Sequence, residues 1–265
     1  MARARTIPAA VRELCLAFPG AEEFESHGSP NYRARLGARK GKVFAVWALN
    51  HHGDGHAGLW LNTPAMEQGR LLASSRHLFK PPYVGPSGWI GVELNKGIGW
   101  KRVCELAHMA WMNSSPPKLV ARLPKAPVVA APTSKMKPQE IDRMLAPKAV
   151  RAAAVLGKIC DALPETGRGA QMGSLTWRTR KRSFVMLYDY GKGIAVQFWV
   201  GIERQSPLIM DPRFSIPRYT GNQGWIALDL GKGFNADELQ DLALGSFRHF
   251  ASKRALASLG GQTPI

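Results

Sequence analysis

The sequence predicts an α+β fold built twice, as two copies of a small domain with helices packed on one face of an antiparallel sheet. A ten-residue segment recurs with six identical positions, and Pro-rich sequence separates the two occurrences. Each copy also runs from an amphipathic helix through short β-rich segments to a second helix. In such a succession the helices cover the apolar face of the sheet, and this arrangement defines the α+β class.

The recurring segment is Gly88–Gly97, which returns as Gly224–Gly233 at a spacing of 136 residues. Nearer the start of each copy, Gly28-Ser29 returns as Gly173-Ser174 at a spacing of 145. Several matches in one order indicate a tandem duplication. We therefore expect a first domain over residues 1–122, a Pro-rich linker over 123–147 and a second domain over 148–265.

Each copy begins with a helix whose apolar residues recur at i, i+3, i+4 and i+7. They are Val11, Leu14, Cys15 and Phe18 in the first copy, and Leu156, Ile159, Cys160 and Leu163 in the second. Pro19 and Pro164 end these helices, because proline disfavours continued helix. The two cysteines lie on the apolar stripe, so we expect them to be core residues and not reactive thiols.

Three short strands follow in each copy, since the segments are rich in Val, Phe, Trp and Tyr and are separated by turn residues. They span residues 30–36, 42–49 and 57–62, and then 175–180, 183–189 and 194–199. The Gly-Trp-Ile segment is a further strand, and a closing helix follows it. In the second copy that helix starts at Asn235, with Glu238 three residues later as in a capping box. We expect four to six strands per sheet, with the first and last helices on one face.

The charge is strongly positive, with 36 Lys and Arg against 19 Asp and Glu and an isoelectric point near 10.2. Residues 1–122 carry a net charge of +8, residues 123–147 one of +2 and residues 148–265 one of +7. Both copies are basic, so the charge belongs to the domain and not to a tail. Nucleic acid is the common polyanionic partner of such proteins. A solvated Arg-rich surface without a partner is the alternative.

The basic residues cluster in the same hairpin of both copies. They are Arg33, Arg35, Arg39, Lys40 and Lys42 in the first copy, and Arg178, Arg180, Lys181 and Arg182 in the second. Alternate strand residues share a face, so the paired arginines can project together onto phosphates. The alternative is a solvated hairpin whose charges protect a sheet edge. We favour binding, and we expect the two hairpins to contribute about equally.

The loop before each Gly-Trp-Ile strand also combines a cation with an aromatic, in Lys80 with Tyr83 and in Arg218 with Tyr219. An exposed pair of this kind can stack on a base. For the tyrosines we favour the other interpretation, in which they fold into the core against Trp89 and Trp225. Lys96 and Lys232, at matching turns, are additional candidates for phosphate contact.

No metal site, cofactor or catalytic motif is expected. The tract His51-His-Gly-Asp-Gly-His56 falls in a Gly-rich turn, and the second copy has no such tract, so we interpret it as an ordinary turn. Nucleophile-elbow, Walker, dinucleotide-binding and zinc-protease patterns do not occur in the sequence. No apolar run is long enough to span a bilayer or to form a signal at Met1–Pro8. Three scattered cysteines suit a reducing cytoplasm.

The first copy strongly resembles the MmcQ/YjbR family. The resemblance rests on Phe18-Pro-Gly20, on Gly28-Ser29 before an Arg-rich strand, on Phe79–Leu94 and on the closing Ser115–Ala121. The second copy is similar to a diverged member, whereas members of the family usually carry one domain. The resemblance implies a compact α+β fold, similar to frataxin-type and double-wing domains, and a DNA-binding role.

We therefore expect a non-enzymatic protein that binds nucleic acid, duplex DNA in the first place, through the phosphate backbone with little sequence specificity. We expect a monomer with two pseudo-symmetric domains. The alternative function is a protein-interaction or adaptor module for an acidic peptide or protein partner, because basic charge suits both ligands.

Overall fold

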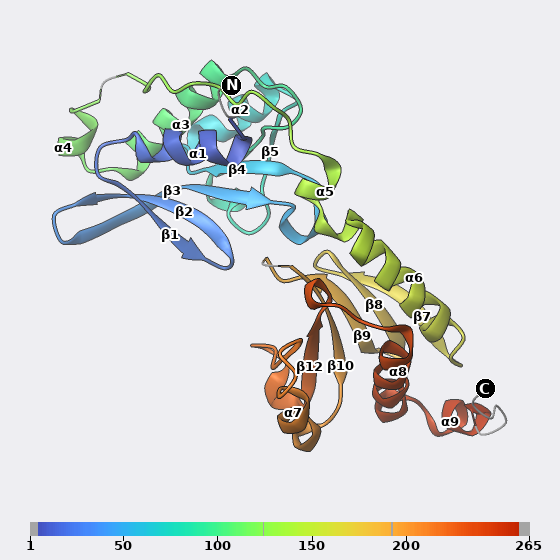
Figure 1. Cartoon of the computed structure of the whole chain (residues 1–265). Helices are drawn as coiled ribbons and strands as arrows, with labels where there is room; N and C mark the ends of the chain where they lie inside the picture. The colour runs from blue at the N-terminus through green and yellow to red at the C-terminus, as the bar shows by residue number, and fades with distance from the viewer. Residues whose placement is uncertain (1–4, 124, 192, 260–265) are drawn as a thin grey trace. The chain divides into compact units, whose positions relative to one another are not determined.

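The fold is that of a computed structural model, which describes residues 5–123, 125–191 and 193–259 (Figure 1). The chain divides into two compact units, unit 1 over Met1–Ile141 and unit 2 over Asp142–Ile265. Each unit has its own hydrophobic core.

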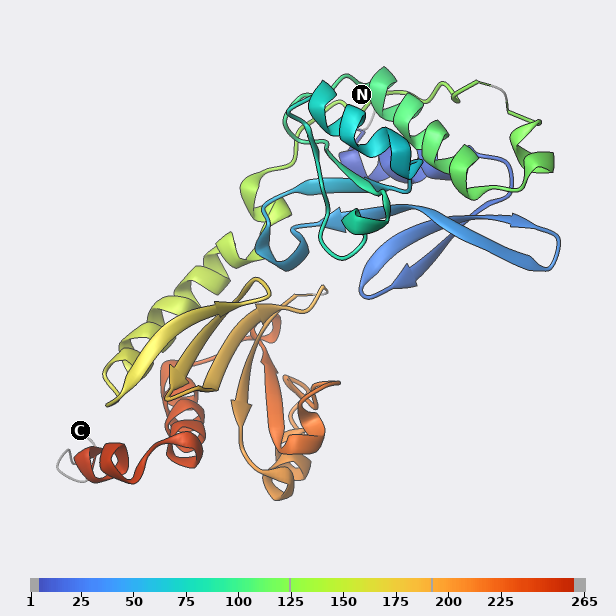
Figure 2. The same ribbon diagram turned by 180° about the vertical axis from the view of Figure 1, so that it is seen from behind.

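Unit 1 combines a six-stranded antiparallel sheet with helices. Its principal elements are α1 (Ile7–Leu16), β1 (Ala21–Ser26), β2 (Ser29–Leu36), β3 (Arg39–Leu49), β4 (Ala57–Leu61), α2 (Gln68–Ser74), β5 (Leu78–Phe79), β6 (Ile90–Glu93), α3 (Trp100–Ser114), α4 (Pro117–Val120) and α5 (Pro138–Ile141). The strand order is β1-β2-β3-β4-β6-β5. Helices α1 and α3 lie together on one face of the sheet (Figure 2).

Unit 2 repeats this plan. Its elements are α6 (Pro147–Asp161), β7 (Thr166–Gln171), β8 (Ser174–Thr179), β9 (Arg182–Asp189), β10 (Ile194–Trp199), α7 (Ile202–Leu208), β11 (Phe214–Ser215), β12 (Trp225–Asp229), α8 (Ala236–Phe250) and α9 (Lys253–Leu259). The strand order, β7-β8-β9-β10-β12-β11, matches that of unit 1 strand for strand. The same succession in both units supports the predicted duplication.

Strand register makes the equivalence precise at the level of residues. In unit 1, Glu22 lies opposite Arg33, and in unit 2 Gly167 lies opposite Arg178. A register shift directly precedes each of the two arginines, and a second shift follows Arg33, so both hairpins have a β-bulge at the same point. A bulge adds twist and re-aims side chains, which places the basic hairpins similarly in both units.

Helices form at the predicted apolar stripes, but the opening helices end at Leu16 and Asp161, so Phe18 and Leu163 lie beyond them. Thr6 caps α1 and accepts a hydrogen bond from the Ala9 amide, and Asn235 caps α8 by accepting one from the Glu238 amide. Cys15 and Cys160 are fully buried, as expected, and burial raises the pKa of the Cys160 thiol to about 12. Both thiols are therefore core groups at neutral pH.

The first strand of each unit escaped prediction. In β1 the sequence is Ala-Glu-Glu-Phe-Glu-Ser, and in β7 it is Thr-Gly-Arg-Gly-Ala-Gln. Neither alternates apolar with polar residues, because each is an edge strand with no buried residue. The short helices α2 and α7 and the two-residue strands β5 and β11 were also missed. The four to six strands expected per sheet become six in both units.

The first part of the Pro-rich segment is not a free spacer, because it packs on unit 1. The Trp100 indole donates to the Val129 carbonyl at 2.9 Å, and Val129 is buried. Asn95 donates to the carbonyl of Met136 and accepts from its amide. A Pro-rich chain makes few hydrogen bonds of its own, so its backbone groups are available to a neighbouring surface. Unit 1 accordingly extends to Ile141, beyond the predicted boundary at residue 122.

Candidate nucleic-acid interface

The basic hairpin of unit 1 shares its charge with a carboxylate. Arg33, on β2, donates from Nε to Glu22 on the neighbouring β1, and its guanidinium lies 4.2 Å from the ring centre of Phe24. Arg35 donates from Nη1 to the other oxygen of Glu22 at 3.1 Å. The hydrogen bond from Arg33 is the main reason that the pKa of Glu22 lies below its usual value. Two of the predicted phosphate-binding cations are therefore held by one acidic side chain.

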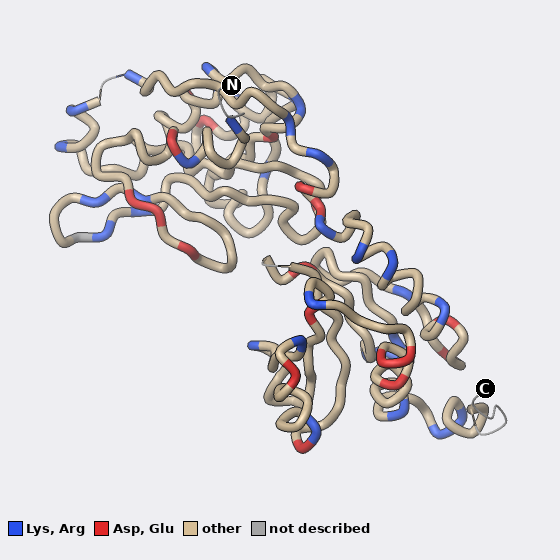
Figure 3. Tube along the Cα trace, in the orientation of Figure 1, with Lys and Arg blue, Asp and Glu red and all other residues tan. Residues whose placement is uncertain are grey.

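Acidic residues line the whole of β1, as Figure 3 shows, with Glu22, Glu23 and Glu25 in a strand of six residues. Glu23 is itself paired with Arg12 of α1 at 2.6 Å. Lys40 and Lys42, on β3, are exposed and form no ion pair within the described residues. The side chain of Arg39 lies outside the described part of the structure. Unit 1 thus presents a mixed surface at this hairpin.

In the described part of unit 2, no carboxylate is hydrogen-bonded to the hairpin arginine, although Glu165 lies in the depression beside the hairpin. Arg178 faces Gly167, and its described partners are the Ser183 hydroxyl at 3.3 Å and the Gln171 side-chain oxygen at 3.4 Å. Arg180, Lys181 and Arg182 are exposed at the turn. Among the residues that the structure describes, no ion pair involves any of these four cations. Their charge is therefore available to a ligand.

A shallow depression of about 490 Å³ lies beside this hairpin and is lined by Arg168, Arg178, Arg180, Arg254 and Glu165, with Thr166 and Gly167. Arg168 also bonds to Asp161 of α6, at 2.9 Å from its Nε, and Arg254 bonds to Glu165 at 2.5 Å. The hydrogen bond from Arg254, with a smaller contribution from Arg180, lowers the pKa of Glu165. The depression is a concave site with more arginines than carboxylates.

Sequence reasoning missed Arg168 and Arg254 as members of this site. Arg168 lies on β7, a strand that the residue pattern does not reveal, and Arg254 lies on α9, after the closing helix. The signal that could have found Arg254 is its place in Ala251–Leu256, the segment that stands where the first copy has its closing motif. Pairing of β7 with β8 brings Arg168 to the hairpin, and helix α9 brings Arg254 there.

The interpretation of Tyr83 and Tyr219 as core residues was wrong, because their side chains are 68% and 78% exposed. In each unit a glutamine side chain bonds to the backbone of the loop that carries the tyrosine. Gln205 donates to the carbonyls of Gly221 and Trp225, both at 2.7 Å, and Gln68 makes the equivalent pair of bonds in unit 1. Each amide thus links two carbonyls of its loop, while the tyrosine of the same loop is exposed.

The other cations of the two loops have different surroundings. Arg218 is exposed, with its guanidinium 5.7 Å from the ring centre of Tyr219, so the predicted pairing of cation and aromatic occurs in unit 2. The aliphatic part of the Lys80 side chain packs on Gly85, and Lys80 is exposed. Lys96 is exposed, whereas Lys232 donates to the Pro212 carbonyl at 2.5 Å.

The histidine tract is tied into the sheet of unit 1. His56 bonds through Nδ1 to Glu93 at 2.6 Å and stacks on Phe79, with 4.3 Å between ring centres. His51 lies against Trp60 at 4.6 Å, and its burial lowers the pKa of its imidazole. In the described part of the chain, no group of three or more His, Cys, Asp or Glu side chains could hold a metal ion. Over the same residues, no helix is long and apolar enough to cross a membrane.

Fold and surface together define a class: a duplicated α+β domain in which each copy presents a basic β-hairpin. The YjbR family model matches residues 16–113, which are most of unit 1. No curated protein matches the chain.

A match among solved structures is the crystal structure of the Deinococcus radiodurans protein DR2400, which has the domain DUF419. It is 18% identical to this chain with a TM-score of 0.34, and the match covers 40% of this chain and 85% of that one.

Proposed function

We propose that this protein binds nucleic acid, duplex DNA in the first place, without catalysing a reaction and with little sequence preference. The observation that carries the proposal is the hairpin of β8 and β9, where Arg178, Arg180, Lys181 and Arg182 form no ion pair within the described residues. Cations left without carboxylates can replace the counterions condensed on a phosphate backbone, and release of those counterions drives binding.

The surroundings of this hairpin support the same ligand. The depression beside it is also lined by Arg178 and Arg180, and arginine is suited to bidentate contact with phosphate oxygens, whereas Arg168 and Arg254 in the same depression are paired with Asp161 and Glu165. A loop in the same unit exposes Tyr219 beside Arg218, a combination that stacks on bases irrespective of their identity. Contacts of these two kinds position a protein on nucleic acid and carry little sequence information.

The form that acts is, in this proposal, a monomer of two domains in the cytoplasm. Two weak sites in one chain raise the apparent affinity for a ligand that both can reach. In this proposal unit 2 makes the larger contribution to the binding affinity, because Arg33 and Arg35 of unit 1 are already paired with Glu22.

The test is fluorescence anisotropy with a labelled duplex over a series of salt concentrations. About four to six phosphate contacts give a log–log slope of roughly −4 to −5. Absence of binding at low salt would overturn the proposal. Polyglutamate serves as the competing ligand: if it binds with equal affinity and equal salt dependence, the surface recognises negative charge alone and an acidic protein partner replaces nucleic acid.

A further inference from the structure

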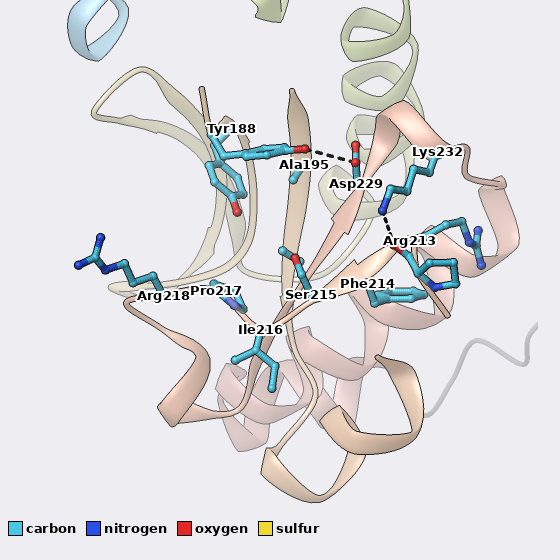
Figure 4. A pocket seen from close by; sticks show the side chains of 13 residues that line it. Tyr188, Ala195, Arg213, Phe214, Ser215, Ile216, Pro217, Arg218, Asp229 and Lys232 are labelled. Carbon is cyan, nitrogen blue, oxygen red and sulfur yellow. Dashed lines mark hydrogen bonds between the residues drawn. The ribbon is translucent and has the colours of Figure 1, made fainter. Parts of the chain in front are cut away.

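Unit 2 contains a pocket on the open face of its sheet, opposite the helices (Figure 4). The pocket has a volume of about 310 Å³, at the lower end of the range for small-molecule sites. Figure 4 shows Tyr188, Ala195, Ser215, Arg218 and Asp229 around it. Its origin becomes clear when the two sheets are compared position by position.

In unit 1 an aromatic ring fills the equivalent place. Strand pairing makes Phe79 of β5 the neighbour of Gly91 on β6, and the ring lies so close that a Cβ at Gly91 would be 2.3 Å from it. The ring also lies over Gly58 on β4, and His56 stacks on it at an interplanar angle of 13°. The sheet face of unit 1 is thus built around one flat ring.

In unit 2 the same register brings Ser215 beside Ala227, so a serine stands where unit 1 has Phe79. Ala195 takes the place of Gly58, and Gly193 precedes β10 where His56 precedes β4. Loss of the phenyl and imidazole rings leaves the cavity. Tyr188 pairs with Ala195 where unit 1 has Ala48 beside Gly58, so a new aromatic wall has appeared.

The polar groups around the pocket indicate a ligand that carries negative charge. Tyr190 donates to Asp229 at 3.2 Å, and the other oxygen of Asp229 accepts from the Gly231 amide, so this carboxylate is satisfied within the protein. Arg213 is matched by Asp211 and Glu238. Arg218 and Lys232 have no ion-pair partner in the described residues, and they leave the rim positive.

From this geometry we infer that the pocket of unit 2 receives one unpaired nucleotide of a nucleic-acid strand. The base would occupy the space that the Phe79 ring fills in unit 1, against Tyr188. The phosphates on the two sides of this nucleotide would lie at Arg218 and at Lys232, which flank the pocket on opposite sides (Figure 4). Every base has a flat π-face that can stack on an aromatic side chain. The inference rests on the proposed function and adds to it a preference for single-stranded or unpaired positions.

The test places the ring of unit 1 into unit 2 by the substitution Ser215→Phe in the full chain. Binding is measured by anisotropy with a labelled strand of about 12 nucleotides, within the usual site size for such proteins, and with the corresponding duplex. The filled pocket should weaken single-strand binding by about tenfold and leave duplex binding unchanged. Tyr188→Ala removes the aromatic ring on which the base would stack and does not fill the pocket. It should weaken single-strand binding in the same way. Met210→Ala, at a side chain that is 83% exposed and does not line the pocket, is the matched control.

The outcomes separate this inference from the proposed function. Single-strand binding that neither pocket variant weakens overturns the inference alone, because the hairpin can still bind. Absence of binding to either nucleic acid overturns both. A third titration uses adenosine 5′-monophosphate without a strand. If Ser215→Phe abolishes its binding and leaves the strand unaffected, the pocket belongs to a free nucleotide and the assignment to a strand is wrong.

Discussion

Arg33 and Arg178 occupy the same place in the two units, yet the strands beside them give them different neighbours. Arg33 faces Glu22 on β1 and donates to it, whereas Arg178 faces Gly167 on β7 and bonds only to neutral side chains among the described residues. Along the sequence the two basic clusters look equivalent, with five cations against four. The charge available to a ligand therefore depends on the partner strand, because an opposing carboxylate neutralises a cation at close range.

The largest expected effect comes from removing the positive charges of the hairpin of β8 and β9 in unit 2. Replacement of Arg178, Arg180, Lys181 and Arg182 by glutamine should weaken duplex binding on the order of a hundredfold at low salt and reduce the salt slope by about three. The corresponding change of Arg33, Arg35, Arg39, Lys40 and Lys42 should cost about tenfold or less, since Glu22 already holds two of these side chains. Anisotropy titrations of both variants decide the matter, and equal losses would mean that the pairing with Glu22 has no influence on binding.

The next effect concerns the glutamines that close the loops. Gln205 is 5% exposed and Gln68 is half-buried, and each donates to two backbone carbonyls. Gln205→Ala should destabilise unit 2 by about 1–3 kcal/mol, because two inward-facing carbonyls lose their donor. Gln68→Ala should cost unit 1 less, since water can reach its carbonyls.

Hydrogen exchange in the segments 84–89 and 216–224 reports the two openings separately. The exposed Gln223 is the control position for alanine substitution. If Gln68→Ala accelerates exchange in the unit 1 loop more than Gln205→Ala does in the unit 2 loop, the expected order of the two effects is wrong.

A smaller effect follows from exchanging the residue that faces the hairpin arginine in each unit. Gly167→Glu introduces a carboxylate opposite Arg178, where nothing lies within 4 Å of the added Cβ, and it should weaken duplex binding about threefold. Glu22→Gln releases Arg33 and Arg35 and should strengthen binding by a similar factor.

Gly167→Gln adds the same bulk without charge and should leave the affinity unchanged. If it weakens binding as much as Gly167→Glu does, bulk rather than charge at this position limits the site. Anisotropy at low salt gives all three affinities.

The smallest effect is the titration of Glu22 itself. Its pKa in the folded protein lies below the usual 4.5, chiefly because Arg33 donates to it. The stabilisation from this pair is complete above pH 4.5, where the carboxylate is ionised in the folded and unfolded chains alike, and it is lost as pH falls through the lower folded pKa. In Arg33→Gln the pKa should rise toward its usual value. Carboxyl NMR resolves this titration, and an unchanged pKa would contradict the bond from Arg33.

Much of the fold follows from residue patterns. The opening helices and the three central strands of each unit have the periodicity that their burial requires, and the repeated Gly-Trp-Ile segment aligns the units. The edge strands β1 and β7 have no buried face, so no alternation marks them. The packing of residues 125–141 on unit 1 had no signal either, because a Pro-rich segment looks the same whether it is free or bound.

For the candidate site, the sequence identified which residues are basic but not which remain unpaired. It located the hairpin arginines and lysines, and it missed Arg168 and Arg254, which reach the hairpin from β7 and α9. It also placed Tyr83 and Tyr219 in the core, although an aromatic next to a turn can face either way and here faces solvent.

By itself, the sequence determined that the domain is duplicated, that both copies are basic and that the cations recur in the same hairpin. These properties are local, since they depend on residue type and on spacing along the chain. Tertiary structure decided that Glu22 meets Arg33 while Gly167 meets Arg178, and that Phe79 fills a space which Ser215 leaves open. Such neighbours are set by the register between strands, so the same arginine is neutralised in one unit and free in the other.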